Sequence, residues 1–469
     1  MKKDILDRFF GGRKVALLGF GQEGQSSFRT LRTFLPELPL TVCDKNQELV
    51  HGTDGFDPGG KVKWHLGPAY LEGLREADII IRSPGVSMLL LDRLHLRSQV
   101  TSQTEIFLSL FREQISGITG TKGKSTTSSL LHHLLDSAGI RSILAGNIGS
   151  PVFDLIPGLD PHTRVVFEMS SHQLQPVRIS PHMAVLLNLF PEHLDHYASF
   201  RDYGQAKLNI CRWQHADDML FVQARDPNLA GLMDGMAYPQ AVVSIGSPVP
   251  WTPYFAAFAG SGPDLVMELP AGSFRMEGLA RKIRLPGAHN LLNVAAAVAA
   301  AVSMGAGPEA VEAGVEGFGG LPHRLELVGT VNGVAFYNDS ISTVPESTMA
   351  ALRAFPKAAS LILGGFDRGI DYAGLMEFIG DSQVRQICFL GDAGRRMHEL
   401  AAGNPAFRDR QCLLAGTFEE AFLKASKACR AGDICLLSPA AASYDIFRDF
   451  RERGDRFREL VRQLAGTAR

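Results

Sequence analysis

The sequence predicts an α/β protein of about three domains. Its 469 residues suffice for that number at roughly 150 residues per domain. Short apolar runs that end in glycine-rich or Ser/Pro turns recur along the chain, and helix-like stretches alternate with them. This alternation is typical of parallel sheets covered by helices. We expect the segments 1–102, 103–320 and 321–469 to form the domains.

Composition argues against several classes of protein. Charged residues make up 20%, apolar residues 45%, and the formal net charge is −2, without a long Lys/Arg run that would indicate a nucleic-acid or membrane partner. The six cysteines lack C-x-x-C spacing, which disfavours disulfides and zinc. Residues 1–8 lack the apolar core of a signal peptide, and residues 291–306 are too short to span a membrane. We therefore expect a cytoplasmic protein.

The first domain opens with a strand at 14–18 that runs into Gly19-Phe20-Gly21-Gln22-Glu23-Gly24, a G-x-G-x-x-G turn before a helix. The next strand, 40–43, ends at Asp44, where dinucleotide-binding folds hold a ribose. This pattern alone favours NAD. The alternative is a Rossmann-like unit whose glycines only allow the helix to pack closely on the strand.

A further strand at 77–82 ends in a turn at Ser83. Ligands of open α/β sheets bind beyond the carboxyl ends of strands, so Asp44 and Ser83 are candidates for polar contacts with a nucleotide-like ligand. Either residue could equally cap a helix.

The central domain is organised around the glycine-rich stretch 117–127. An apolar strand, a turn with the sequence T-G-T-K-G-K-S-T and a helix would place backbone N–H groups around a phosphate. Lys124 would reach the outer phosphates, and Ser125 or Thr126 would ligate Mg²⁺. The glycine that the strict motif has at position 118 stands at Gly117 instead, so this is a variant loop. The alternative is a surface turn that opens a helix.

Two later strands also end in polar residues. The strand at 164–167 ends at Glu168, where a Mg²⁺-ordering acid is expected, although a solvent-facing acid fits the pattern too. The strand at 184–190 leads into residues 191–196, which contain His193 and Asp195 and could bind a metal, move protons or be structural. Lys207, by itself, has the pattern of a surface lysine.

Taken together, these motifs resemble those of the Mur ligases of peptidoglycan synthesis over nearly the whole chain. The resemblance is carried by Thr119–Thr126, Gly146–Gly149, Glu168–Ser171, Asn188–Asp195, Ala206-Lys207, His289-Asn290, Leu321–Arg324, Asn338–Ser340 and Leu437–Ser443. It implies a Rossmann-like N-terminal domain that binds a UDP-substrate, a central P-loop ATPase domain with a mostly parallel sheet, and a Rossmann-like C-terminal domain that binds an amino acid. In that family the G-x-G-x-x-G unit holds a UDP-sugar and not NAD.

The resemblance also implies roles for single residues. The residues expected to bind ATP are Gly120, Thr121, Lys122, Gly123, Lys124, Ser125, Thr126, Asn290, Arg324 and Asp339. Two Mg²⁺ ions are expected, one held by Ser125 and Glu168 and one by His193 and a carbamylated Lys207. Lys124, His193 and Lys207 are the expected catalytic residues.

Within the family, the chain most resembles members that add D-glutamate to UDP-N-acetylmuramoyl-L-alanine. The residues expected to contact these substrates are Gly21, Asp44, Ser83, Asn147, Ser170, Thr343, Arg368, Ser443 and Phe450. Ile341 and Arg368 stand where many D-glutamate ligases have Lys, and a branch that adds L-glutamate carries similar turns. Arg can still bind a carboxylate through two hydrogen bonds, so both isomers of glutamate stay open.

The resemblance therefore implies an ATP-dependent amide ligase that works through an acyl phosphate. We expect a monomer, and the composition indicates neither a nucleic-acid nor a membrane partner. A folylpolyglutamate synthase shares this chemistry but lacks the N-terminal G-x-G-x-x-G unit. An NAD-dependent oxidoreductase would leave the phosphate loop, Glu168 and His193 unexplained. A non-catalytic nucleotide-binding switch is a further alternative.

Overall fold

The computed structural model describes residues 2–52, 62–96, 99–148, 150–193, 196–260 and 262–467. Gly149, Leu194 and Asp195, which belong to the motifs above, lie outside the described residues. The chain forms two compact units, Met1–Ile283 with Ala288–Phe318 and Arg284–Gly287 with Gly319–Arg469. Within the described residues, no helix combines the length and apolar character needed to cross a bilayer.

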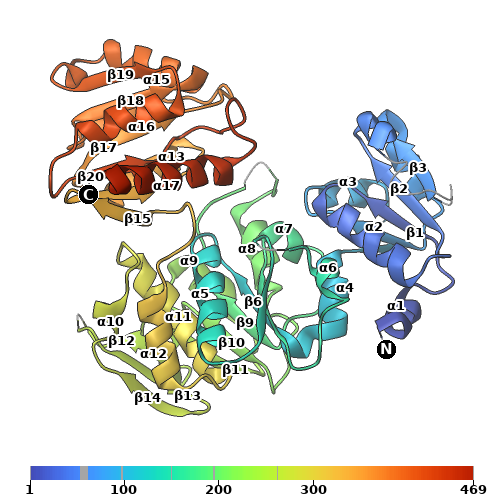
Figure 1. The fold of residues 1–469 in the computed structure, drawn as a ribbon. Helices are drawn as coiled ribbons and strands as arrows, with labels where there is room; N and C mark the ends of the chain where they lie inside the picture. The colour runs from blue at the N-terminus through green and yellow to red at the C-terminus, as the bar shows by residue number, and fades with distance from the viewer. Residues whose placement is uncertain are drawn as a thin grey trace. The chain divides into compact units, whose positions relative to one another are not determined.

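The first unit begins with a parallel sheet in the order β3-β2-β1-β4-β5 (Figure 1). Its elements are α1 (Lys2–Phe10), β1 (Val15–Leu18), α2 (Gln22–Phe34), β2 (Leu40–Asp44), η1 (Gln47–Gly52), β3 (Val62–Leu66), η2 (Gly67–Leu74), β4 (Ile79–Arg82), α3 (Met88–Arg93) and β5 (Val100–Thr101). The strand, glycine turn and helix predicted from residue 14 onward are confirmed, with β1 starting one residue later.

A second sheet of the same unit has the order β14-β13-β12-β11-β10-β9-β6-β8-β7. It is parallel from β7 to β12 and antiparallel over the edge strands β13 and β14. Its strands are β6 (Ile115–Thr119), β7 (Ser142–Gly146), β8 (Arg164–Glu168), β9 (Met183–Leu186), β10 (Met219–Val222), β11 (Ala241–Ile245), β12 (Tyr254–Phe258), β13 (Leu265–Leu269) and β14 (Gly272–Met276).

Helices flank this second sheet. They are α4 (Gln103–Phe111), η4 (Arg112–Gln114), α5 (Lys124–Ser137), α6 (Val152–Leu155), α7 (Ser171–Leu174), α8 (Phe200–Leu208), α9 (Pro227–Met233), α10 (Leu279–Lys282), α11 (His289–Ser303) and α12 (Pro308–Gly317). The alanine-rich α11 contains most of the apolar run at 291–306, and its small buried side chains let it pack against α5.

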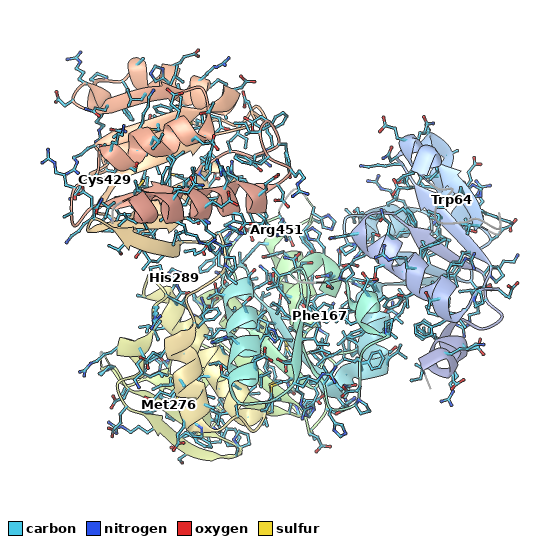
Figure 2. All side chains as sticks on the ribbon, viewed as in Figure 1. Trp64, Phe167, Met276, His289, Cys429 and Arg451 are labelled. Carbon is cyan, nitrogen blue, oxygen red and sulfur yellow. The ribbon has the colours of Figure 1, made fainter. Side chains whose placement is uncertain are left out.

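One apolar core includes side chains from both sheets of the first unit. Phe167 of β8 is completely buried in it, and Trp64 of β3 packs on its edge, with its ring centroid 5.3 Å from that of Phe20. Figure 2 labels Phe167 and Trp64. Because both sheets contribute to this core, they are joined by packing as well as by the chain.

The predicted strand at 184–190 is too long at its carboxyl end. β9 stops at Leu186 because the next residues turn to bond the phosphate loop: Leu187 N donates to Thr119 O (3.0 Å), and Asn188 O accepts from Thr121 N (2.9 Å). Leu187 and Leu189 are buried whereas Phe190 is 48% exposed, so the apolar pattern of residues 187–190 reflects partial burial in a loop rather than strand geometry.

The second unit contains a sheet in the order β15-β16-β20-β17-β18-β19, parallel except for the pair β15 and β16. Apolar runs at 358–364, 386–390 and 434–437 form three of its strands, as expected from the alternation of apolar runs with helix-like stretches. The elements are β15 (Glu326–Val331), β16 (Val334–Asn338), α13 (Pro345–Ala354), β17 (Ala358–Gly364), α14 (Ala373–Gly380), β18 (Gln386–Leu390), α15 (Gly391–Ala402), η5 (Pro405–Phe407), β19 (Gln411–Ala415), α16 (Phe418–Lys427), β20 (Ile434–Leu437) and α17 (Phe450–Thr467).

Alternating side chains divide the core of the second unit in two. Leu361 and Leu363 of β17 pack with α13, α14 and α15, whereas Ile362 packs with α16 and α17. Successive side chains of a strand point to opposite faces of its sheet, so helices cover both faces. The predicted α/β class with mostly parallel sheets is confirmed.

Candidate functional site

The phosphate loop connects β6 to α5 through two glycines whose positive φ angles other residues rarely adopt. Gly123 has a φ of +86°, and a Cβ there would lie 2.4 Å from Asn293 Oδ1. Gly120 has a φ of +154°, and its Cβ would lie 2.9 Å from that of Leu187. Gly123 caps α5 without a side-chain hydrogen bond. The first N–H groups of this helix are thus presented by a tight turn, as at phosphate-binding helix ends.

The two lysines of the loop have different partners. Lys124 Nζ donates to Gly120 O (3.0 Å) and Thr121 O (2.9 Å), which folds it back over the loop. Lys122 Nζ lies 2.6 Å from Glu192 Oε1, and its backbone N donates to Asn188 Oδ1. Since Lys122 is mostly exposed, its ion pair adds little stability.

Lys207 is not the surface lysine that its local sequence indicates. It is 2% exposed on α8, and its Nζ donates to Gly120 O at 2.7 Å. Burial lowers the pKa of Lys207 well below 10.5, and the charge of Lys124 lowers it further. Such an environment favours the neutral amine, which is the nucleophilic form.

Glu168 is completely buried at the end of β8. Its Oε1 accepts from Asn147 Nδ2 at 3.0 Å, and its Oε2 has no hydrogen-bond partner among the described residues. A half-satisfied buried carboxylate is costly, and a bound cation would remove that cost. Glu168 therefore fits the Mg²⁺ ligand that the sequence predicts.

No group of three or more His, Cys, Asp or Glu side chains in the described part of the chain is placed to hold a metal ion. The predicted set of magnesium ligands therefore depends on the Ser125 hydroxyl and on carbamylation of Lys207, which would turn this cation into a carboxylate. As an ammonium or a neutral amine bonded to Gly120 O, Lys207 is not a ligand for Mg²⁺, which prefers oxygen.

A cavity of about 330 Å³ brings five of the predicted residues together, namely Lys124, Asn147, Ser170, His193 and Lys207. Pro84, Gly85, Ser171, His172 and Tyr203 complete its lining, and the sequence reasoning missed all of these. Tyr203 lies one helical turn before Lys207, whose Nζ is 4.9 Å from the centre of the tyrosine ring. That i, i+4 spacing could have identified Tyr203.

His172 is packed among other rings in this cavity, with ring centroids 4.2 Å from His196 and 5.0 Å from His193. Burial lowers the pKa of His172 to about 4, and both neighbouring imidazoles contribute. The side chain is therefore neutral at physiological pH. Buried Arg82 donates to His172 O (2.7 Å) and Pro84 O (3.3 Å), so it ties two walls of the cavity together.

The G-x-G-x-x-G turn is closed by the two polar residues expected near a ligand. Asp44 Oδ2 accepts from Phe20 N (2.6 Å), and Ser83 Oγ donates to Gly19 O (2.8 Å). A Cβ on Gly24 would lie 2.2 Å from Gly19 O, so this glycine permits close helix packing, whereas one on Gly21 would meet no atom within 4 Å. The turn thus has a structural role at Gly24, and it leaves open space beside Gly21.

In the second unit, the buried carboxylate of Asp339 accepts hydrogen bonds from three groups. It accepts from Ser342 Oγ (2.6 Å), Ser438 Oγ (2.8 Å) and Leu325 N (3.1 Å). Burial nevertheless raises the pKa of Asp339 to about 6. Asn290 belongs to the first unit, where its Oδ1 accepts from Asn293 Nδ2 at 2.8 Å.

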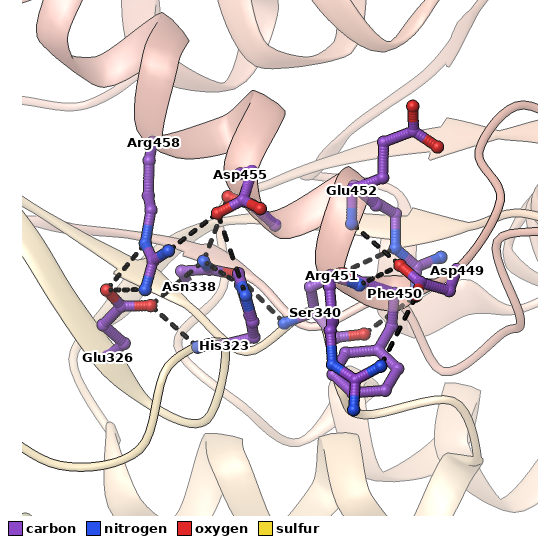
Figure 3. A network of polar contacts seen from close by, with 12 residues as sticks. His323, Glu326, Asn338, Ser340, Asp449, Phe450, Arg451, Glu452, Asp455 and Arg458 are labelled. Atoms are coloured by element: carbon purple, nitrogen blue, oxygen red, sulfur yellow. Dashed lines mark hydrogen bonds and ion pairs between the residues drawn. The ribbon is translucent and has the colours of Figure 1, made fainter. Parts of the chain in front are cut away.

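Arg324 lies between two residues with left-handed backbone, His323 (φ +64°) and Leu325 (φ +45°). A polar network anchors this turn (Figure 3): Glu326 Oε2 accepts from His323 N (2.7 Å), and Asn338 Nδ2 lies 3.1 Å from His323 Nδ1. Arg458 Nε donates to Glu326 Oε1 at 2.8 Å. The turn that presents Arg324 is thus held in a strained conformation by its surroundings.

The glutamate-site candidates Thr343, Arg368, Ser443 and Phe450 all belong to the second unit. Arg368 Nη2 donates to Thr343 O at 2.6 Å. Asp367, a neighbour with which Arg368 could have paired, binds Arg396 instead through two hydrogen bonds of 2.8 and 2.9 Å. The structure thus joins two of the candidates directly.

Comparison with known proteins adds independent evidence. Residues 118–301 match the Mur ligase middle domain, and residues 323–441 match the Mur ligase, glutamate ligase domain. The crystal structure of MurF from Acinetobacter baumannii has a similar fold, with a TM-score of 0.56 and 17% identity over 87% of this chain and 83% of that one.

Curated relatives match almost end to end. The chain is 32% identical to UDP-N-acetylmuramoylalanine–D-glutamate ligase of Ruminiclostridium cellulolyticum, over 99% of this chain and 98% of the relative. It is 34% identical to UDP-N-acetylmuramoyl-L-alanine–L-glutamate ligase of Salinispora tropica, over 97% and 98%. On this evidence, the chain belongs to the Mur ligase family.

Proposed function

We propose that the protein is an ATP-dependent ligase that joins D-glutamate to UDP-N-acetylmuramoyl-L-alanine in peptidoglycan synthesis. The observation that carries this proposal is the cavity in which Lys124 of the phosphate loop lies with Asn147, His193 and the buried Lys207. Full-length similarity to glutamate ligases supports the substrates. Membership of this family favours a ligase over the NAD-dependent oxidoreductase that the glycine turn alone allowed.

L-glutamate is the second candidate for the incoming amino acid. Ile341 and Arg368 depart from the lysines that many D-glutamate ligases carry, and a relative that adds L-glutamate is as similar as those that add the D isomer. Arg368 supplies a planar group that can bind the side-chain carboxylate of either isomer.

The proposed reaction has two steps. A carboxylate oxygen of the UDP-linked substrate attacks the γ-phosphorus of ATP, and the bond to ADP breaks to leave an acyl phosphate. The amine of glutamate then attacks the carbonyl carbon, loses a proton and expels inorganic phosphate. Negative charge gathers on oxygen in both steps, so Lys124 and the N–H groups at the start of α5 would act chiefly by stabilising that charge.

Two Mg²⁺ ions are part of the proposal, and they would neutralise phosphate charge when bound. Ser125 and Glu168 would hold one ion, and the buried, unpartnered Oε2 of Glu168 supports this assignment. His193 and Lys207 would hold the other. Lys207 Nζ would first attack carbon dioxide and release a proton to give a carbamate, and its lowered pKa favours that reaction.

We further propose that residues 1–102 bind the UDP moiety through Gly21, Asp44 and Ser83, that residues 103–320 bind ATP, and that residues 321–469 bind glutamate. The ATP contacts of Arg324, Asp339 and Asn290 stay predictions. We expect the protein to act as a monomer in the cytoplasm.

The test is phosphate release by the purified protein with Mg-ATP and UDP-N-acetylmuramoyl-L-alanine, run in parallel with D-glutamate, L-glutamate and no amino acid. Release with D-glutamate alone is expected. Release with L-glutamate alone would select the second candidate. Release with neither would refute the proposed substrates, and identical release without any amino acid would refute the ligase reaction.

A further inference from the structure

Arg453 of α17 is an arginine buried to 2% exposure, and all five of its N–H groups are engaged. Its Nε donates to Ser340 Oγ (2.9 Å), and its Nη2 donates to Ser340 O (2.8 Å) and Ala441 O (3.1 Å). Its Nη1 donates to Ala441 O (3.1 Å) and Ala442 O (3.3 Å). One guanidinium thus joins two loop segments that are a hundred residues apart in the sequence.

These segments carry the glutamate-site candidates. Ser340 begins the turn that reaches Thr343, and its Oγ also donates to Phe450 O at 2.8 Å. Figure 3 shows Ser340 beside Phe450. Ala441 and Ala442 lead directly into Ser443. Arg453 therefore bonds the backbone next to Ser443 and three residues before Thr343, and it is linked to Phe450 through the hydroxyl of Ser340.

The fourth candidate, Arg368, is connected to the same point. Its loop begins at Gly364-Gly365, and Phe366 N donates to Ala442 O at 2.9 Å. Gly365 has a φ of +140°, and a Cβ there would lie 2.2 Å from Ala442 O and 3.2 Å from Arg453 Nη1. The loop thus packs so closely on the arginine and its acceptor that only glycine fits.

Burying a charged arginine in this way costs free energy that a fold without a function to serve would not need to spend. Burial lowers the pKa of Arg453 to about 10, against the opposing charge of Asp445, so the group stays charged near neutral pH. Its hydrogen-bond partners are backbone carbonyls and a hydroxyl rather than a carboxylate. The segment it holds also includes Ala440, whose φ of +57° is unfavourable for a residue with a Cβ. A buried charge and a strained turn together indicate a geometry kept for function.

We propose that Arg453 is the positioning residue of the glutamate subsite. It sets the spacing of the segments 340–343, 365–368 and 440–443, and it does so without touching the substrate, because its donors are taken by the protein. The inference rests on the proposed function, since the four candidates are glutamate contacts only in such a ligase.

The test compares R453K and S340A with the control R456K. Arg456 lies on the same helix but forms surface ion pairs with Glu419 and Glu459. R453K keeps the charge and loses the planar five-donor group, whereas S340A removes one acceptor and leaves the arginine. We expect the KM for glutamate to rise about tenfold in R453K and about threefold in S340A, with the KM values of ATP and the UDP-substrate within about twofold of wild type. R456K should match wild type.

A folded R453K, judged by its near-ultraviolet circular dichroism, with an unchanged KM for glutamate would overturn the proposal. So would an equal rise in all three KM values, which indicates general loosening. If R453K does not fold, an unchanged glutamate KM in S340A overturns the proposal by itself. Wild-type protein inactive with both glutamate isomers would instead refute the proposed function, a result known before any variant is made.

Discussion

Replacing Asp339 by Asn should stabilise the second unit while weakening ATP use. Burial raises the pKa of Asp339 from 3.8 to about 6, and each tenfold change in proton affinity is worth about 1.4 kcal/mol. Ionised Asp339 therefore costs the folded unit about 3 kcal/mol at neutral pH. The pKa of Asp339 is higher in the folded state than in the unfolded state. The contribution of this carboxyl to the free energy of unfolding is therefore fully present below about pH 4 and is lost as the pH rises through about 6.

Asn has the same shape without the charge, and the hydroxyls of Ser342 and Ser438 can rotate to accept from its amide. We expect D339N to unfold about 5 to 10 °C above wild type near pH 8, with the gap shrinking towards pH 5. Calorimetry across that range measures the gap, and steady-state kinetics should show a higher KM for ATP.

The control is D449N. Backbone N–H groups of Glu452 and Arg451 lower the pKa of the Asp449 carboxyl (Figure 3). The contribution of this carboxyl to stability therefore grows as the pH rises, and D449N should unfold below wild type near pH 8. A D339N protein that unfolds below wild type near pH 8, or a gap that does not change with pH, would refute the reasoning.

Three further predictions concern the first unit. K207A should lose ligase activity and regain part of it with added short-chain carboxylates, and full activity without them would remove the carbamate from the mechanism. G123A should lose both ATP turnover and at least about 2 kcal/mol of stability, because its Cβ would clash with Asn293 at a positive φ; a variant with wild-type melting and turnover would contradict this. E168Q should raise the Mg²⁺ concentration for half-maximal activity at least about tenfold, and an unchanged Mg²⁺ titration would exclude Glu168 as a ligand.

Local patterns predicted the elements that position the site. The strand before the phosphate loop, its glycines and the carboxylate at the end of β8 follow from short-range rules about strands, turns and helix starts. The same rules failed at residues 187–190, where Leu187 and Leu189 are buried in a loop that bonds the phosphate loop.

Residues whose role depends on distant partners could not be predicted in this way. Lys207 reads locally as a surface lysine, and only the fold brings it to Gly120 O. Arg82 and Arg453 are buried cations with partners far along the chain, and nothing near them in the sequence marks them as buried. His172 follows a recognisable motif, but its depressed pKa arises from rings that the fold brings together.

The central claim is that the substrate carboxylate is activated by phosphate transfer at the cavity around Lys124. It is tested most directly with UDP-N-acetylmuramoyl-L-alanine labelled with ¹⁸O in its free carboxylate, incubated with Mg-ATP, glutamate and the protein. The account predicts that each inorganic phosphate released carries one carboxylate oxygen, seen by mass spectrometry. Phosphate released without label, while the amide product forms, would contradict the acyl-phosphate route.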